Sequence, residues 1–164
     1  ERMFWYATDM KMLLLENIRS AHNVGAMFRT ADGAGVAKIF LCGYTPAPVD
    51  RFGRVQPEIK KTSLGASETI AWEQVGASEV GAFLQEQKRT GATIVALEQT
   101  TQSIPLKDFT APENVLYIVG NEVDGVSPEV LAEVDVVVEL PMLGQKESLN
   151  VSTAAGILMY HGLV

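Results

Sequence analysis

Short apolar segments alternate along this chain with segments whose apolar residues recur at every third or fourth position. The first kind is typical of β-strands buried on both faces, and the second kind is typical of the helices that cover them. This alternation predicts an α/β fold with a mainly parallel sheet flanked by helices. We expect strands over residues 12–16, 38–41, 93–97, 115–119 and 134–140, helices over residues 20–34, 78–89 and 149–161, and a short helix that opens at 127–129.

The remaining segments are less regular. Residues 68–72 are interpreted as a further short strand, and Ser78 as the N-cap of the helix that follows it. Residues 43–57 are rich in proline and glycine and form a loop of unusual length, and such loops are usually functional or mobile. Because no repeat and no domain boundary is evident, we expect residues 1–164 to form a single domain.

The charge of the chain is divided unevenly. Thirteen Lys and Arg face 20 Asp and Glu, which gives a net charge of -7. Residues 1–61 nevertheless carry a local charge of +3, and residues 62–164 a local charge of -10. A polyanionic partner is therefore expected to contact the N-terminal third. The plainer interpretation is that an acidic surface keeps the chain in solution.

The single cysteine, Cys42, excludes an internal disulfide framework and a cysteine-rich metal site. A reducing compartment is the simpler interpretation. No apolar run approaches the roughly 20 residues of a membrane span, and no signal peptide is visible at the start. We therefore expect a cytoplasmic location and no membrane partner.

Ligands of parallel sheets bind beyond the carboxyl ends of the strands, here after Leu97, Val119 and Leu140. The last of these strands runs into a polar loop and then into an alanine-rich helix. Ser148 is a natural N-cap for that helix, and Asn150 follows two residues later. A cap does not account for the whole polar run. The backbone amides and carbonyls of this loop are suited to clasp an adenine-type ring.

A second constellation lies in residues 116–128, where a buried strand runs into Gly120 and two acidic residues. A glycine at a strand end lets a ligand approach the backbone closely. The segment is neither a G-x-G-x-x-G fingerprint nor a P-loop, and Glu122 and Asp124 would repel phosphates. It therefore predicts a neutral or cationic ligand, although a plain strand-to-helix turn would have the same residues.

A third constellation lies at the start of the first helix, where Asn23 and Arg29 follow a strand. Six residues correspond to about 600° of rotation around a helix, so the two side chains need not share a face. Taken alone, Arg29 is equally well explained as an exposed helix charge.

Taken together, these stretches resemble the SpoU-type, or TrmH-like, RNA 2′-O-ribose methyltransferases of the SPOUT class. The resemblance covers about residues 13–164 and comprises three motifs in the family's order. The matching residues are Asn23 and Arg29, then Gly120, Glu122 and Gly125, then Pro141, Met142, Ser148, Leu149, Asn150 and Ser152.

The resemblance implies a C-terminal segment tucked into a deep trefoil knot, a homodimer packed through the knot, and S-adenosylmethionine as the methyl donor. The knot would form the cofactor pocket, which needs no metal. By position, the residues that would line this pocket are Leu97, Gly120, Leu140, Met142, Ser148 and Leu149.

Arg29 matches the family's catalytic arginine, which acts on the ribose 2′-hydroxyl of the RNA. A guanidinium with a pKa above about 12 is a poor base at neutral pH. We therefore expect Arg29 to grip the adjacent phosphate and to stabilise the developing alkoxide. Asn23, Ser148 and Asn150 would orient Arg29 and the sugar, and Glu122 would hold Asn23 or the arginine in place.

The substrate that the resemblance implies is a transfer or ribosomal RNA. Arg29 would contact it, and the cluster formed by Arg51, Arg54, Lys60 and Lys61 is the best further candidate contact. The alternative for this cluster is a solvated loop. We expect no separate RNA-binding domain within residues 1–164.

Two other function classes remain open from the residues. One is a non-catalytic RNA-binding protein on the same fold, in which cofactor binding is absent or inert. The other is a Rossmann-like oxidoreductase, which the missing phosphate-binding glycine motif disfavours. His22 and His161 are interpreted as helix-end residues and Cys42 as a buried strand residue, so acid–base or thiol chemistry is not assigned to them.

Overall fold

A single seven-stranded sheet, with every strand pair parallel, forms the centre of the computed structural model, which describes residues 10–164. The strand order is β3-β2-β1-β6-β4-β7-β5. The predicted α/β fold with a parallel sheet is thus confirmed. The strands are β1 (Met10–Glu16), β2 (Lys38–Cys42), β3 (Ala71–Val75), β4 (Thr93–Leu97), β5 (Ile104–Pro105), β6 (Asn114–Val119) and β7 (Val136–Glu139).

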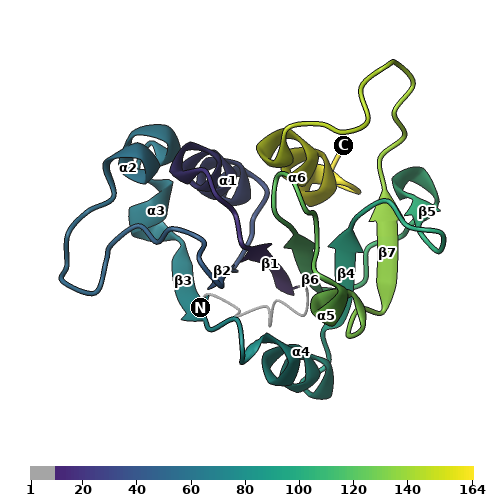
Figure 1. Cartoon of the computed structure of the whole chain (residues 1–164), viewed down its shortest axis with the longest axis horizontal. Helices are drawn as coiled ribbons and strands as arrows, with labels where there is room; N and C mark the ends of the chain where they lie inside the picture. Colours follow the sequence, from purple (N-terminus) through teal and green to yellow (C-terminus); the bar gives the residue numbers. More distant parts are fainter. Residues whose placement is uncertain (1–9) are drawn as a thin grey trace, which may run out of the picture.

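Helices cover both faces of the sheet (Figure 1). One face carries α1 (Ala21–Gly33), α2 (Pro57–Ser63), α3 (Ala66–Thr69) and α6 (Val151–Tyr160). The opposite face carries α4 (Val80–Arg89) and α5 (Pro128–Leu131), and a short 3-10 turn spans Leu106–Asp108. Among residues 10–164, no helix is long and apolar enough to cross a membrane. The trefoil knot stays a prediction.

The central strand β1 shows why its sequence has no polar face. Leu13 and Leu15 are fully buried in the core beneath α1 and α6. Met12 and Leu14 point the other way, into the core beneath α4 and α5. Since successive side chains of a strand alternate between faces, a strand covered on both sides reads as a continuous apolar run.

The strand predicted over residues 68–72 is wrong in its boundaries. Residues 66–69 form the short helix α3, closed by the amide of Ile70 donating to the Ala66 carbonyl at 3.0 Å. The strand β3 begins only at Ala71, where it pairs with Lys38 of β2. As the edge strand, β3 leaves most of its side chains exposed, so it lacks the apolar pattern that identified the other strands.

The start of α4 also differs from the prediction, because Ser78 is not its N-cap. The helix begins at Val80, and Glu79 occupies the cap position without a capping hydrogen bond from its side chain. The Glu79 carboxylate instead accepts the Gly76 amide at 3.2 Å.

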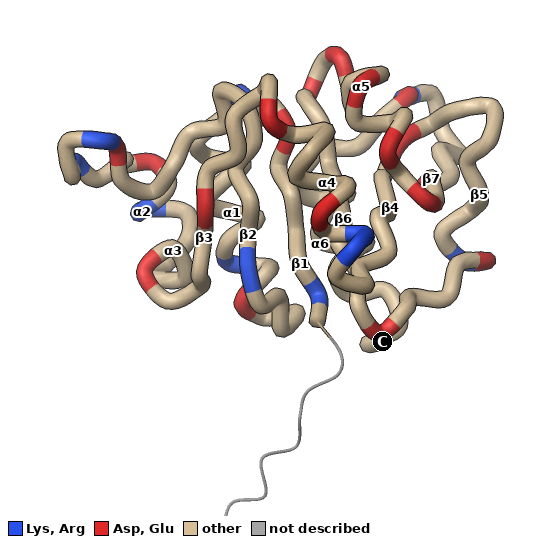
Figure 2. Tube along the Cα trace, turned by 90° about the horizontal axis from the view of Figure 1, so that it is seen from below, with Lys and Arg blue, Asp and Glu red and all other residues tan. Residues whose placement is uncertain are grey.

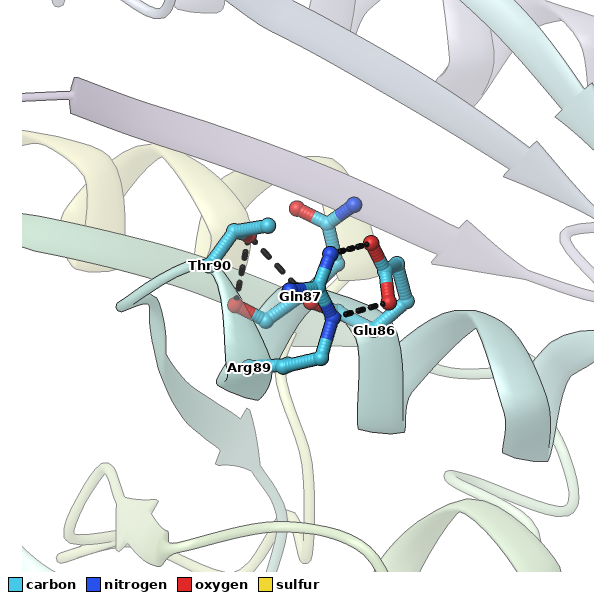
Figure 3. Close-up of polar contacts among 4 residues, drawn as sticks. All are labelled: Glu86, Gln87, Arg89 and Thr90. Atoms are coloured by element: carbon cyan, nitrogen blue, oxygen red, sulfur yellow. Dashed lines mark hydrogen bonds and ion pairs between the residues drawn. The ribbon is translucent and has the colours of Figure 1, made fainter.

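Figure 3 shows how α4 ends. Arg89 donates to both carboxylate oxygens of Glu86, and this hydrogen bonding lowers the pKa of that carboxyl. The Thr90 hydroxyl lies 3.2 Å from the Glu86 carbonyl and 3.0 Å from the Gln87 carbonyl. Both carbonyls also accept backbone amides, from Thr90 and Ala92, so the hydroxyl adds a second contact at the end of the helix.

The predicted long loop is confirmed over residues 43–56, but the helix α2 that follows it was not foreseen. α2 is seated directly on α1. A Cβ added to Gly25 of α1 would come within 2.8 Å of the Ile59 carbonyl oxygen. The Thr62 hydroxyl donates to the His22 carbonyl at 3.1 Å. The two helices therefore form one closely packed pair.

The predicted positions of His22 and His161 at helix ends and of Cys42 in a buried strand are confirmed. His22 is exposed in the first turn of α1, and His161 follows the last turn of α6. An imidazole nitrogen of His161, Nε2, lies 2.5 Å from the Phe109 carbonyl oxygen. Cys42 is buried in β2, where desolvation, followed by the nearby charge of Glu16, raises the pKa of its thiol to about 11. A thiol of this kind is a packing group at neutral pH.

Candidate active site

A cavity of about 530 Å³ lies at the carboxyl ends of β4, β6 and β7. This size is typical of small-molecule sites, which range from about 300 to 1,000 Å³. Its wall comes from residues within four chain segments, 97–100, 119–126, 139–142 and 148–154, together with Leu131 of α5. All the residues predicted to line a cofactor pocket lie in this wall, namely Leu97, Gly120, Leu140, Met142, Ser148 and Leu149.

The turn after β6 brings backbone atoms to the cavity. Asn121 and Gly125 exchange backbone hydrogen bonds of 3.1 and 2.9 Å, and the Asn121 side-chain oxygen accepts the amides of Val123 and Asp124. Gly125 has a φ of 71°, which favours glycine. A Cβ on Gly120 would overlap the backbone of Gly125, so only glycine fits this close approach.

A polar cluster joins the three sequence motifs at the edge of the cavity. The Glu122 carboxylate accepts the amides of Arg19 and Ser20, at 2.9 and 3.1 Å, and the Asn23 side-chain amide at 3.2 Å. Asn23 in turn accepts the side-chain amide of Asn150 at 3.2 Å. Residues that are about 100 or more positions apart in sequence thus meet at one point, and the prediction that Glu122 holds Asn23 is confirmed.

The hydrogen bonds on Glu122 also set its charge. Partial burial acts to raise the pKa of this carboxyl, but the amides of Arg19 and Ser20 and the side chain of Asn23 together outweigh it. The pKa of Glu122 is therefore lowered below its ordinary value of 4.5. The side chain is an anion at neutral pH, fixed by donors from the start of α1.

A carboxylate whose pKa is lower in the folded than in the unfolded chain stabilises the fold above its unfolded pKa. That stabilisation is lost as the pH falls through its folded pKa. Glu122→Gln is therefore expected to lower the free energy of unfolding at pH 7 by about 1 kcal/mol, a small value because the carboxylate is partly exposed. The difference in the free energy of unfolding between this variant and the unchanged protein should shrink as the pH falls below 4.5. Urea unfolding at several pH values between 7 and 3 measures this difference.

Asp124→Asn is the matched control, because the Asp124 carboxylate lies in the same turn and accepts no hydrogen bond from the described residues. This variant should unfold like the unchanged protein throughout the titration. A Glu122→Gln effect that stays constant down to pH 3 would contradict a role for the charge of Glu122.

Asn150, rather than Ser148, is the N-cap of α6. Its side-chain oxygen accepts the amides of Ser152 and Thr153, at 2.9 and 3.3 Å. The expectation that Ser148 caps the helix is wrong, because the helix begins three residues later, at Val151. Ser148 is instead exposed in the loop between β7 and α6, where it lines the cavity.

Arg29 does not line this cavity. It is exposed on α1 and borders a separate hollow. The other walls of this hollow include His22 of α1, Lys61 and Thr62 of α2, and Tyr160 of α6. Asn23 and Arg29, the two residues of the motif at the start of α1, are thus separated. Asn23 joins the polar cluster, whereas Arg29 lies about 9 Å further along the helix, at 1.5 Å per residue.

The other predicted RNA contacts are also exposed. Arg51 and Arg54 lie in the long loop, and Lys60 and Lys61 lie on α2. Lys61 shares the hollow with Arg29. Figure 2 shows Lys and Arg on the long loop and on α2, and further ones on β1 and β2.

The electrostatics of the cavity confirm the prediction of an acidic site. Its lining includes four carboxylates and no Lys or Arg, and the acidic residues are Glu98, Glu122, Asp124 and Glu139. Fields of this sign repel phosphate groups and favour cations. Sequence reasoning assigned no role to Glu98, Glu139 or Asn121. Glu98 directly follows β4, so its place at the carboxyl end of a strand was the available signal.

Glu98 and Glu139 are held as part of the wall. Glu98 accepts the amides of Val126 and Gln99, at 2.9 and 2.8 Å, and so ties the turn after β6 to the end of β4. Glu139 accepts the Ser103 hydroxyl at 2.7 Å. Glu98, Glu122 and Glu139 are thus fixed by hydrogen bonds rather than by basic partners.

The fold and the site together define a class: an α/β protein with an acidic cavity of small-molecule size beside a polar cluster at the carboxyl edge of a parallel sheet. The sequence narrows this class to one family. The chain belongs to the SpoU rRNA Methylase family, whose model matches residues 10–160.

Individual relatives agree with this membership. The 23S rRNA (guanosine-2′-O-)-methyltransferase RlmB of Neisseria meningitidis serogroup B is 31% identical over 148 residues, which cover 90% of this chain and 56% of that protein. The AdoMet-bound rRNA methyltransferase from Sinorhizobium meliloti has a TM-score of 0.82 at 25% identity, over 93% of this chain and 55% of the other. A solved structure concerned with 2-OH methylation of C/U34 on tRNA has a TM-score of 0.77 at 25% identity and covers 95% of both chains. This chain therefore spans just over half the length of the RlmB relatives.

Proposed function

We propose that this protein transfers the methyl group of S-adenosylmethionine to a ribose 2′-hydroxyl of a structured tRNA or rRNA. The observation that carries the proposal is the acidic cavity at the carboxyl edge of the sheet, beside which Glu122, Asn23 and Asn150 join three motifs. Relatives described as rRNA methyltransferases, one of them bound to AdoMet, support the same activity.

The residues of the cavity fit this cofactor. S-adenosylmethionine carries a positively charged sulfonium, and the lining offers carboxylates without a competing cation. The close packing of Gly120 against Gly125 brings the backbone of the turn to the cavity wall, and Leu140 and Leu149 supply apolar wall. The same lining disfavours a nicotinamide dinucleotide, whose phosphates would face Glu122 and Asp124.

When bound, S-adenosylmethionine supplies a methyl group on a sulfonium, which leaves as the new C–O bond forms and the C–S bond breaks. The protein must hold the ribose hydroxyl in line with that methyl group. Asn23, Ser148 and Asn150 orient the sugar at the rim of the cavity, and Glu122 fixes Asn23. Arg29 grips the neighbouring phosphate with its two-pronged guanidinium and stabilises the alkoxide that develops as the 2′-hydroxyl passes its proton to that phosphate. This role requires no metal.

Because Arg29 lies outside the cavity of its own protomer, we propose a homodimer in which Arg29 of one protomer faces the cavity of the other. The outer face of α6 supports this arrangement. Ile157 is 43% exposed, and a hollow between α6 and α1 is walled by small and apolar groups that include Ala26 and Gly156. A second copy would cover this apolar face.

The remaining assignments follow from this activity. The substrate RNA would lie against the cluster of Arg51, Arg54, Lys60 and Lys61. A single domain without a separate RNA-binding domain stays a prediction for residues 1–164. A cytoplasmic location, where tRNA and rRNA are present and Cys42 stays reduced, fits both the substrate and the lone thiol.

The activity is tested by incubating the protein with S-adenosylmethionine labelled on its methyl group and with total cellular RNA. Label in 2′-O-methylnucleosides, identified by mass spectrometry after digestion, is the expected result. Label confined to bases would contradict the proposal. Calorimetry with S-adenosylmethionine and NAD distinguishes the alternatives. Tight binding of NAD alone would indicate an oxidoreductase, and RNA binding without binding of either small molecule would indicate a non-catalytic RNA-binding protein.

A further inference from the structure

The tip of the long loop, residues 49–55, stands away from the sheet at the end of the molecule opposite β5 (Figures 1 and 2). Its segments carry basic residues in Figure 2. Nothing in the methyl-transfer cavity depends on this tip, because none of its residues lines the cavity. The tip therefore calls for a separate explanation.

The tip is internally braced. Val49 and Val55 form an antiparallel bridge, and the amide of Asp50 donates to the Arg54 carbonyl at 2.9 Å. The Asp50 carboxylate accepts the amides of Phe52 and Arg54, at 2.8 and 2.9 Å, and the Arg54 guanidinium at 2.7 Å. One aspartate thus fixes the backbone of the tip, so whatever the tip presents is presented in a defined orientation.

What the tip presents is an exposed aromatic ring with two guanidinium groups close to it. Phe52 is 67% exposed, although it is among the most apolar side chains. The guanidinium carbon of Arg51 lies 4.7 Å from the centre of the Phe52 ring, and that of Arg54 lies 5.1 Å from it. Among the described residues, Arg51 makes no ion pair, so its charge is available to a partner.

This combination matches the chemistry of an unpaired nucleotide. A base stacks on an aromatic ring or on a guanidinium plane, while the flanking phosphates attract arginine. A paired base offers no open face, so a helical segment of RNA would use only the charges. An acidic protein surface would likewise use the arginines and leave the exposed ring unused.

We propose that Phe52 is a stacking platform for an unpaired base of the substrate RNA, with Arg51 and Arg54 holding the adjacent phosphates. This inference rests on the proposed function, since it assigns the RNA a single-stranded contact away from the methylated sugar. The path between the two points is basic. The loop leads into α2, which carries Lys60 and Lys61, and Lys61 borders the same hollow as Arg29.

The test measures binding to two probes by fluorescence anisotropy at low salt. One is an RNA of about 12 nucleotides of C and A only, which cannot pair with itself, and the other is a duplex of equal length. Phe52→Ala should weaken binding of the single strand about tenfold and leave the duplex unchanged. Phe52→Trp should retain affinity, and the single strand should quench its fluorescence beyond any quenching seen with the unchanged protein.

Salt dependence separates stacking from charge. Phe52→Ala should leave the slope of log K against log salt unchanged, whereas Arg51→Gln should reduce it by about 0.7 for a single-stranded probe. Ile104→Ala is the matched control, because Ile104 is another exposed apolar residue, on β5 at the far end of the sheet. It should change neither affinity nor slope.

The inference is overturned if Phe52→Ala binds both probes as the unchanged protein does, or weakens both equally. It is also overturned if the tryptophan variant shows no added quenching. Because these readouts are binding measurements, they do not depend on methyl transfer. If Phe52 stacks on the single strand but the protein methylates no ribose, only the proposed function is overturned. If the protein does methylate ribose, and Phe52→Ala changes neither RNA binding nor the methylation rate, only the stacking platform is overturned.

Discussion

Replacing Gly120 with alanine is expected to abolish binding of S-adenosylmethionine. The added Cβ would overlap backbone atoms of Gly125 and Val126, which cannot yield as a flexible side chain would. The turn must then shift away from β6 and into the cavity. We expect affinity to fall at least about a hundredfold, equivalent to about 2.8 kcal/mol, as measured by calorimetry. The free energy of unfolding should fall by about 1–3 kcal/mol, as for other overpacked sites.

Gly144→Ala provides the control for this substitution. Gly144 lies in the exposed loop between β7 and α6, and a Cβ built on it meets nothing within 4 Å. This variant should bind S-adenosylmethionine as the unchanged protein does. Equal affinities for the Gly120 and Gly144 variants would show that the cofactor does not occupy the cavity beside Gly120.

Arg29→Ala is expected to remove methyl transfer while leaving S-adenosylmethionine affinity nearly unchanged. Arg29 lines no part of the cavity, so its loss affects only the sugar and phosphate of the RNA. Removing a group that stabilises a developing oxyanion typically costs about 10²- to 10³-fold in rate. Single-turnover assays should show this loss. Arg29→Lys should recover only part of it, because an ammonium lacks the two-pronged geometry.

Arg89→Ala is the control for Arg29, because it removes an exposed arginine from α4 on the other face of the sheet. Its methyl transfer should match that of the unchanged protein. A fully active Arg29→Ala variant would refute the assigned role.

Mixing the two inactive variants tests whether Arg29 acts across a dimer. A protomer with Arg29→Ala keeps an intact cavity, and one with Gly120→Ala keeps its arginine. If the arginine serves the partner's cavity, half of the dimers formed by random mixing each contain one complete site, and about a quarter of the original activity returns. If it serves its own cavity, mixing restores nothing, and the cross-dimer arrangement is wrong.

The sequence predicted the residues that line the cavity better than it predicted the bounds of the helices and strands around it. Leu97, Gly120 and Leu140 were identifiable because buried strands end at or beside them, and ends of parallel strands meet at one edge. β3 and α2 were misjudged or missed because exposed edge strands and short helices have weak apolar periodicity. Glu98 was overlooked because a single acidic residue after a strand resembles ordinary surface.

The hydrogen bonds of the polar cluster could not be predicted from local sequence. Glu122 meets Asn23 across 99 positions, and Asn23 meets Asn150 across 127, so only tertiary structure determines these pairs. The same reason applies to Arg29. Its spacing from Asn23 was known, but helix rotation and the placement of α2 decide that it borders another hollow.

The close seating of α2 on α1 at Gly25 has a consequence for how such a protein diversifies. The loop 43–56 enters α2, and α2 is locked to the helix that carries Arg29, so a change of loop sequence leaves the chemistry where it is. Under the proposed function, target selection and methyl transfer would in this sense be modular. Grafting a different loop tip between β2 and α2 would then be a rational route to redirecting the proposed methyl transfer toward another RNA.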